Sequence, residues 1–150
     1  MELAPASVSR SIVLPAPADE VWASLRDADG LAGWLGDAVD LDVVPGAAGT
    51  VVDGGVVRRV VVTEVVEGRS LGLVWWDEAA PEEASVVTIA LAPGEADGGT
   101  TTVTVTERLA GSAVASVAGA RIDDLAAVEA SWDQRLQALV GESALAPACV

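Results

Sequence analysis

The stretch from Asp123 to Val140 constrains the fold most, because it carries the longest amphipathic helical pattern in the chain. Its apolar residues recur at gaps of three and four positions, which puts them on one face of an α-helix of about 3.6 residues per turn. They are Leu125, Val128, Trp132, Leu136 and Leu139. Such a helix needs a second layer to cover its apolar face, and we expect the preceding residues to supply a sheet.

Most of the chain before this helix has the pattern of strands joined by short turns. Apolar and polar residues alternate in several segments, and turn residues such as Pro45-Gly46 and Gly54-Gly55 separate them. We expect strands at residues 8–14, 37–43, 49–53, 56–66, 70–76, 84–91 and 100–109, and short helices at 17–25 and 29–35. Short connections favour antiparallel pairing. The pattern predicts one α+β domain over residues 1–150, with its core at 8–140 and a loose tail at 141–150.

The composition excludes several kinds of chemistry. The chain of 150 residues has no His, no Lys and no Tyr, and its single cysteine, Cys149, lies beside the C-terminus. A Ser-His-Asp triad, a Cys-His pair, the usual zinc sites and Schiff-base chemistry on a lysine are therefore excluded. We expect no metal, no cofactor and no intrachain disulfide. Any catalysis would have to use carboxylates, Arg, Ser, Thr and bound water.

The net charge of −15 limits the partners. It would repel nucleic acid and anionic lipid, and no Arg-rich run could form a phosphate-binding patch. The first ten residues lack a basic start followed by an apolar run, and no apolar stretch reaches the roughly 18 residues that span a bilayer. We therefore expect a cytoplasmic protein that binds neither nucleic acid nor membrane. The acidity itself fits either a biased coding sequence or adaptation to salt.

Short motifs along the chain match those of a known family. The matching residues, in order, are Pro17, Val21, Trp22, Leu31, Trp34, Asp40, Leu41, Pro45, Gly46, Val62, Glu64, Val65, Leu71, Leu73, Trp75, Gly98, Gly99, Thr100 and Trp132. Their order and spacing resemble the helix-grip (Bet v-like) fold of the START-like, or SRPBCC, superfamily. Within it they are most similar to the AHSA branch, the homologues of the activator of the heat-shock-protein-ninety ATPase.

The resemblance implies a specific architecture and a cavity. A curved antiparallel sheet of about six or seven strands would wrap around the long C-terminal helix, with two short helices after the first strand. A ligand cavity would lie between the helix and the concave face of the sheet. Leu35 and Ala47 depart from the AHSA branch, which often has Trp and Gly at these places, so the identity of the ligand does not carry over.

We expect the walls of this cavity to come from one strand face and from the last helix. Alternation places Leu71, Leu73 and Trp75 on the interior face of their strand. Trp132 and Leu136 would face them from the helix, and Trp34 is a further ligand-binding candidate. Plain core packing is the alternative for each of these residues.

Two charged residues complete the predicted site. Glu107 continues the inward face of its strand, so it could orient a ligand or, in an enzyme, act as a base; a solvated strand end is the alternative. Arg58 and Arg59 are adjacent on a strand, so one of them must point inward, where it could hold a ligand carboxylate. Alternation puts Arg58 on the same face as Glu64, which favours a pair on the surface instead.

Three functions fit this sequence. The one we expect is non-catalytic binding of a small hydrophobic or aromatic molecule. The second is a polyketide-cyclase-like or hydrolase-like enzyme that uses Glu107 as its base, since members of the superfamily can work by shaping a reactive substrate. The third is docking on a chaperone or a regulator, as the family name suggests. A homodimer is compatible with all three.

Overall fold

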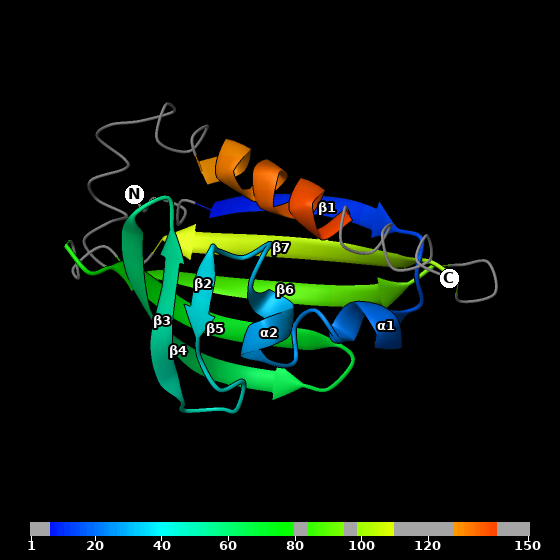
Figure 1. Ribbon diagram of the computed structural model, residues 1–150. Coiled ribbons are helices and arrows are strands. Elements are labelled where there is room, and N and C mark those ends of the chain that lie inside the picture. Colours follow the sequence, from blue (N-terminus) through cyan, green and yellow to red (C-terminus); the bar gives the residue numbers. More distant parts are fainter. Residues whose placement is uncertain (1–6, 80–83, 95–98, 110–127, 141–150) are drawn as a thin grey trace, which may run out of the picture.

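Seven strands form one antiparallel sheet in the order β1-β7-β6-β5-β4-β3-β2 (Figure 1). The computed structural model describes residues 7–79, 84–94, 99–109 and 128–140. The strands are β1 (Ser7–Leu14), β2 (Ala38–Asp40), β3 (Ala48–Asp53), β4 (Val56–Val66), β5 (Ser70–Asp77), β6 (Ser85–Pro93) and β7 (Thr101–Leu109). β1 pairs with β7, so the first strand and the last lie side by side. With the helix at residues 128–140, this arrangement confirms the predicted α+β helix-grip fold.

Two short helices follow β1, as predicted: α1 (Ala18–Trp22) and α2 (Ala28–Leu31). The Asp27 side chain caps α2 by accepting a hydrogen bond of 2.8 Å from the Gly30 N–H. α2 ends earlier than the expected residue 35, because the backbone of Ala32 is extended (φ −68°, ψ 143°).

The strand expected at residues 37–43 is also shorter and covers only Ala38–Asp40. The chain turns immediately afterwards, where the Val44 N–H donates to the Asp42 carbonyl over 3.0 Å. The hairpin between β3 and β4 agrees with the prediction, since Gly54 and Gly55 have φ values of 58° and 84°, which suit a tight two-residue turn.

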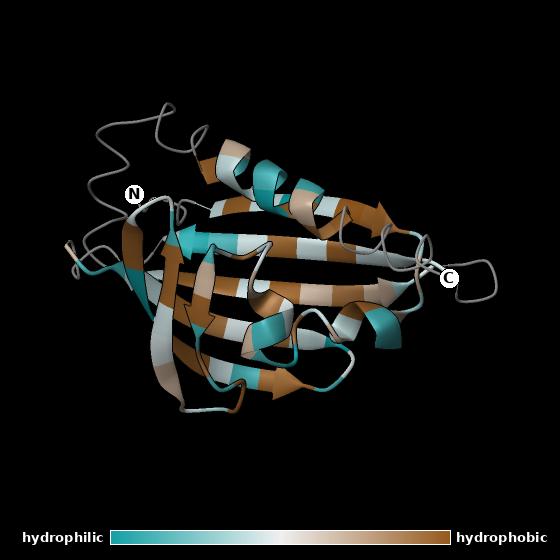
Figure 2. Ribbon diagram, in the orientation of Figure 1, coloured by the Kyte–Doolittle hydropathy of each residue, from teal (hydrophilic) through white to brown (hydrophobic). Residues whose placement is uncertain are grey.

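The core lies between one face of the sheet and the helices. Buried residues alternate with more exposed ones along β1 and β6, and alternating hydropathy colours are visible in β6 and β7 (Figure 2). The helix at residues 128–140 turns Trp132, Leu136 and Leu139 inward, each no more than 2% exposed. These burials confirm the predicted inward face of the helix. Residues 123–127, which the prediction also placed in this helix, lie outside the described residues.

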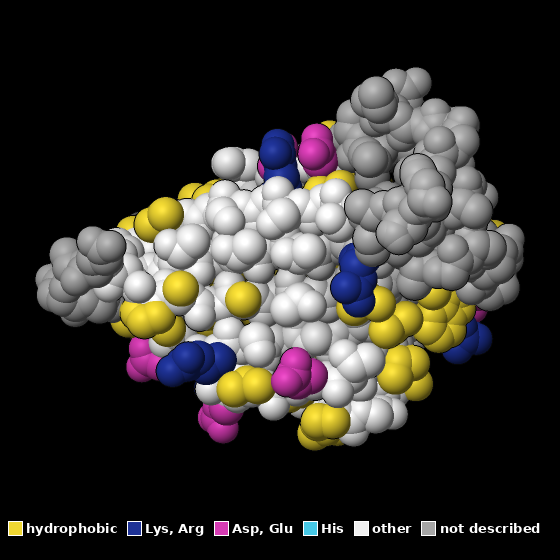
Figure 3. Space-filling model, turned by 180° about the vertical axis from the view of Figure 1, so that it is seen from behind, with side chains coloured by type: hydrophobic (Ala, Val, Ile, Leu, Met, Phe, Trp, Pro, Cys, Tyr) yellow, Lys and Arg dark blue, Asp and Glu magenta, His cyan; other side chains and the backbone are white. Residues whose placement is uncertain are grey.

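The other face of the sheet carries small and hydroxyl-bearing side chains over β1, β6 and β7. Ser11 and Thr104 form a hydrogen bond of 2.9 Å across the β1–β7 pair, and acidic side chains are few over this face in Figure 3. The buried carboxylate and the buried guanidinium described below lie on the inner side instead.

A β-bulge in β4 separates two residues that were expected to share a face. The pairing with β5 shifts between Val62 and Glu64, so that Glu64 lies opposite Gly72 on the outer face. Arg58 lies before the bulge and reaches the inner face, where its guanidinium contacts the Trp75 ring. The predicted surface pair of Arg58 with Glu64 is therefore wrong, because simple alternation fails across the bulge.

No helix in the described part of the chain is long and apolar enough to cross a bilayer. Nor do His, Cys, Asp and Glu side chains, over the same residues, come together in a group of three or more that could hold a metal ion.

Candidate functional site

A buried carboxylate from β7 joins two tryptophans at the centre of the inner face. Glu107 is 9% exposed and accepts one indole N–H on each oxygen: from Trp75 of β5 over 3.0 Å and from Trp132 of the last helix over 2.8 Å. An indole nitrogen can only donate, so the carboxylate satisfies both rings at once. Glu107 therefore fixes the helix to the sheet through polar contacts inside an apolar layer.

The two indole rings also stack on each other. The centroids of Trp75 and Trp132 lie 5.7 Å apart with an interplanar angle of 18°, an offset-stacked arrangement. Trp75 is 2% exposed and Trp132 is 1% exposed. The pair is thus a flat, rigid platform with its N–H edges turned to Glu107.

Two guanidinium groups lie against this platform. The Arg58 Cζ atom is 4.9 Å from the centroid of the Trp75 ring. The Arg135 Cζ atom is 5.2 Å from the same ring and 4.8 Å from that of Trp132. All three distances are within the range of cation–π attraction.

Hydrogen bonds hold Arg135, which is 6% exposed, from three directions. Its Nε donates to the Leu35 carbonyl over 3.0 Å, and its two terminal nitrogens donate to the Ser131 hydroxyl and to Asp53, the latter over 2.9 Å. Burial lowers the pKa of Arg135, and the neighbouring charge of Arg58 lowers it further, while Asp53 and Glu107 raise it. The site therefore holds two cations close enough to repel each other, balanced by two carboxylates.

A hollow of about 160 Å³ opens beside this cluster. Arg135, Asp53, Trp34 and Ser131 are among the residues that line it, so Arg135 belongs both to the hollow and to the buried cluster. Trp34 is 2% exposed, and its indole N–H donates to the Ser24 carbonyl over 2.9 Å.

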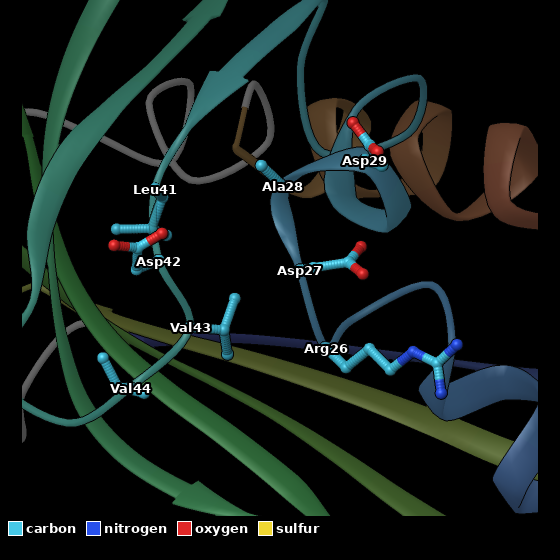
Figure 4. A pocket seen from close by; sticks show the side chains of 8 residues that line it. All are labelled: Arg26, Asp27, Ala28, Asp29, Leu41, Asp42, Val43 and Val44. Carbon is cyan, nitrogen blue, oxygen red and sulfur yellow. The ribbon is translucent and has the colours of Figure 1, made fainter.

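A larger hollow, of about 510 Å³, lies away from the cluster, between residues 26–29 and residues 41–44 (Figure 4). The side chains of Arg26 and Asp27 point away from the segment of Leu41 to Val44 in that view. Arg26, Asp27, Asp29 and Asp42 are among its lining residues, but no ion pair joins these four, and we assign the hollow no role.

Most of the predicted residues come together. Trp75, Trp132, Glu107 and Arg58 meet in one cluster, and Trp34 lines the hollow next to it. Leu71, Leu73 and Leu136 are buried at 0%, 0% and 2% exposure and belong to the apolar core. Neither of the two hollows is lined by these leucines, by the stacked tryptophans or by Glu107, so the predicted cavity directly under the helix stays a prediction.

Arg135 and Asp53 are the residues of this site that the sequence did not reveal. Arg135 falls three positions after Trp132 and directly before Leu136, on the apolar side of the helix, and a charge on such a face is the signal that could have found it. Asp53 was visible only as part of a turn, because its partner lies 82 residues further along the chain.

Comparisons with known proteins agree with this architecture. The family model described as activator of Hsp90 ATPase homolog 1-like protein matches residues 15–143. No curated protein sequence matches the chain.

Solved structures share the fold at low identity. DynU16, a protein of the dynemicin biosynthetic locus, is 25% identical with a TM-score of 0.74; the match covers 89% of this chain but only 45% of that one. MLL2253 from Mesorhizobium loti is 20% identical (TM-score 0.71, covering 91% and 95%). The Aha1 dimer from Colwellia psychrerythraea is 18% identical (TM-score 0.70, covering 89% and 92%).

Proposed function

Because the chain belongs to the family of activator of Hsp90 ATPase homolog 1-like proteins, within the START-like superfamily, we propose that it binds a small aromatic molecule against the Trp75–Trp132 platform without transforming it. The ligand would lie between the sheet and the last helix. Glu107, Arg58 and Arg135 would orient it.

The observation that carries this proposal is the polar cluster inside an apolar layer. A buried charge contributes little net stability compared with an apolar side chain of the same size, because it must lose its hydration. Here Glu107 and Arg135 are both nearly inaccessible and lie against two stacked rings. Buried charges next to flat apolar surface are the usual composition of small-molecule sites.

Access to the cluster supports the same proposal. The hollow of about 160 Å³ ends on Arg135, and Arg58, which contacts the Trp75 ring, is only half-buried. A ligand could therefore reach the platform after a side-chain movement, without unfolding of the sheet.

Tryptophan fluorescence tests the proposal directly. Titration with aromatic compounds should quench the wild-type emission in a saturable way, and Trp132→Phe should remove most of that change. Trp22→Phe is the matched control, because Trp22 is also buried but lies in α1. If no compound quenches the wild-type emission, while circular dichroism shows that the wild type is folded, the binding function is refuted.

An enzyme that uses Glu107 as a base is the second candidate. The geometry favours it less, because each carboxylate oxygen already accepts an indole N–H and a substrate proton would have to share one of them. Mass spectrometry of a bound compound before and after incubation separates the two: an unchanged mass agrees with binding, and a product that Glu107→Gln fails to form indicates catalysis.

The chain could also bind a protein partner or a second copy of itself, and each of these can be tested separately. A chaperone or regulator would be retained in a pull-down at native salt, and a homodimer would double the mass found by sedimentation. A cytoplasmic location can be tested by fractionation of the cells that express the protein.

A further inference from the structure

We propose that Arg58 selects an anionic ligand, an aromatic molecule with a carboxylate or phenolate group. The inference rests on the proposed binding function and specifies which ligands the site prefers.

Arg58 is the cation of the cluster whose donors are available. A guanidinium carries five N–H donors. Within the described residues, the contact that Arg58 makes is with the face of Trp75, and no carboxylate lies within ion-pair distance of it. Its side chain is half-buried, so it is partly removed from water without gaining an acceptor in exchange.

The other charged groups of the cluster are already engaged. Glu107 accepts from two indoles, and Arg135 donates to the Leu35 carbonyl, to Ser131 and to Asp53. An incoming carboxylate would therefore find its donors on Arg58. There it would also offset the repulsion between Arg58 and Arg135 that contributes to the lowered pKa of Arg135.

The same geometry favours an aromatic body for the anion. The Arg58 guanidinium lies 4.9 Å from the Trp75 ring centroid, so an aromatic acid held by Arg58 would bring its flat part near the Trp75–Trp132 platform. The net charge of −15 acts in the opposite sense, because it disfavours every anion at long range. A preference for an acid over a neutral molecule of equal shape must therefore come from local contacts.

A matched pair of probes tests this inference. Naphthalene-2-carboxylate and naphthalene-2-carboxamide have nearly the same shape and differ by one charge. At about 0.15 M salt, where long-range fields are largely screened, the wild type should bind the acid about tenfold more tightly than the amide, as expected for hydrogen bonds to a charged group. Arg58→Met should bring the two affinities within about twofold of each other.

Arg59→Met is the control, because Arg59 is the next residue on β4, is exposed, and pairs with Glu78 over 3.0 Å. Like Arg58→Met, it removes one positive charge, but it should keep the preference for the acid. Equal affinities of the wild type for both probes would overturn the inference and leave the binding function standing. If Arg59→Met no longer prefers the acid to the amide, the preference is a long-range charge effect and the inference is overturned. Failure of both probes to bind the folded wild type would count against the binding function itself, and the inference would fall with it.

Discussion

The replacement Glu107→Gln should destabilise the protein strongly although it changes only one atom and one charge. The wild-type carboxylate accepts indole N–H groups over 3.0 Å and 2.8 Å. A Gln side chain offers one acceptor oxygen and one NH₂ donor, so one of the two indoles, of Trp75 or Trp132, must face another donor. The site cannot relax easily, because both rings are stacked and buried.

The magnitude follows from these contacts. One hydrogen bond to a charged acceptor, worth about 1.5–3 kcal/mol, is lost, and a buried indole N–H is left unsatisfied at a cost of about 1–3 kcal/mol. Since the two terms overlap, we expect the free energy of unfolding to fall by about 3 kcal/mol. For a chain of this size that corresponds to a decrease in Tm of about 6–12 °C. Urea denaturation followed by tryptophan fluorescence and by circular dichroism measures it.

Two comparisons make the test specific. Glu64→Gln changes an exposed residue on the outer side of β4 and should shift stability by no more than about 0.5 kcal/mol. Trp132→Phe removes one of the two N–H donors, so that the amide oxygen of Glu107→Gln can accept from Trp75 alone. The double variant should therefore lose less stability than the sum of the two single losses, by about 1 kcal/mol or more. A Glu107→Gln protein within about 0.5 kcal/mol of the wild type, or strictly additive single effects, would refute the reasoning.

Three further predictions concern other contacts. Arg135→Met should lower the free energy of unfolding by about 1–3 kcal/mol, since it removes the hydrogen bond to a carbonyl beside the core; an unchanged urea midpoint would contradict this. Asp133→Asn should lower stability at pH 7, and this difference should shrink as the pH falls below 3.8, the usual pKa of an aspartate. The hydrogen bond from Arg10 lowers the pKa of Asp133, so the ion pair contributes above the unfolded pKa and is lost as pH falls through the folded one; a pH-independent difference between the two proteins would disagree. Gly49→Ala should be more harmful than Gly46→Ala in thermal melts, because an added Cβ at Gly49 would clash with the Asp40 carbonyl oxygen, whereas at Gly46 nothing lies within 4 Å and the cost is only the strain of a φ of 90°; similar Tm values would count against it.

The sequence predicted the parts of this fold that depend on local periodicity. The period of two fixed the inward faces of β5 and β7, and the gaps of three and four fixed the inward face of the last helix. That is why Trp75, Glu107 and Trp132 were all expected inside, where they are found. The contact of Trp132 with Trp75 and Glu107 was expected only from the resemblance to a helix-grip fold.

What the sequence did not predict depends on breaks in periodicity and on distant partners. The bulge after Val62 moves Glu64 to the outer face, and no residue in this stretch of the sequence indicates a bulge. The partnership of Arg135 with Asp53 joins a helix to a hairpin turn 82 positions away. Such a contact depends on how the helix packs on the sheet, and the periodicity of the sequence does not predict it.

The position of Trp132 after β7 in the sequence has a consequence for how the protein folds during synthesis. When β7 leaves the ribosome, β1 is already available and the sheet can close, but the helix that carries Trp132 follows later. Until that helix arrives, one oxygen of Glu107 and one face of Trp75 remain in water. During synthesis, the docking of Trp132 is therefore the step that completes the polar contacts of Glu107 and covers Trp75.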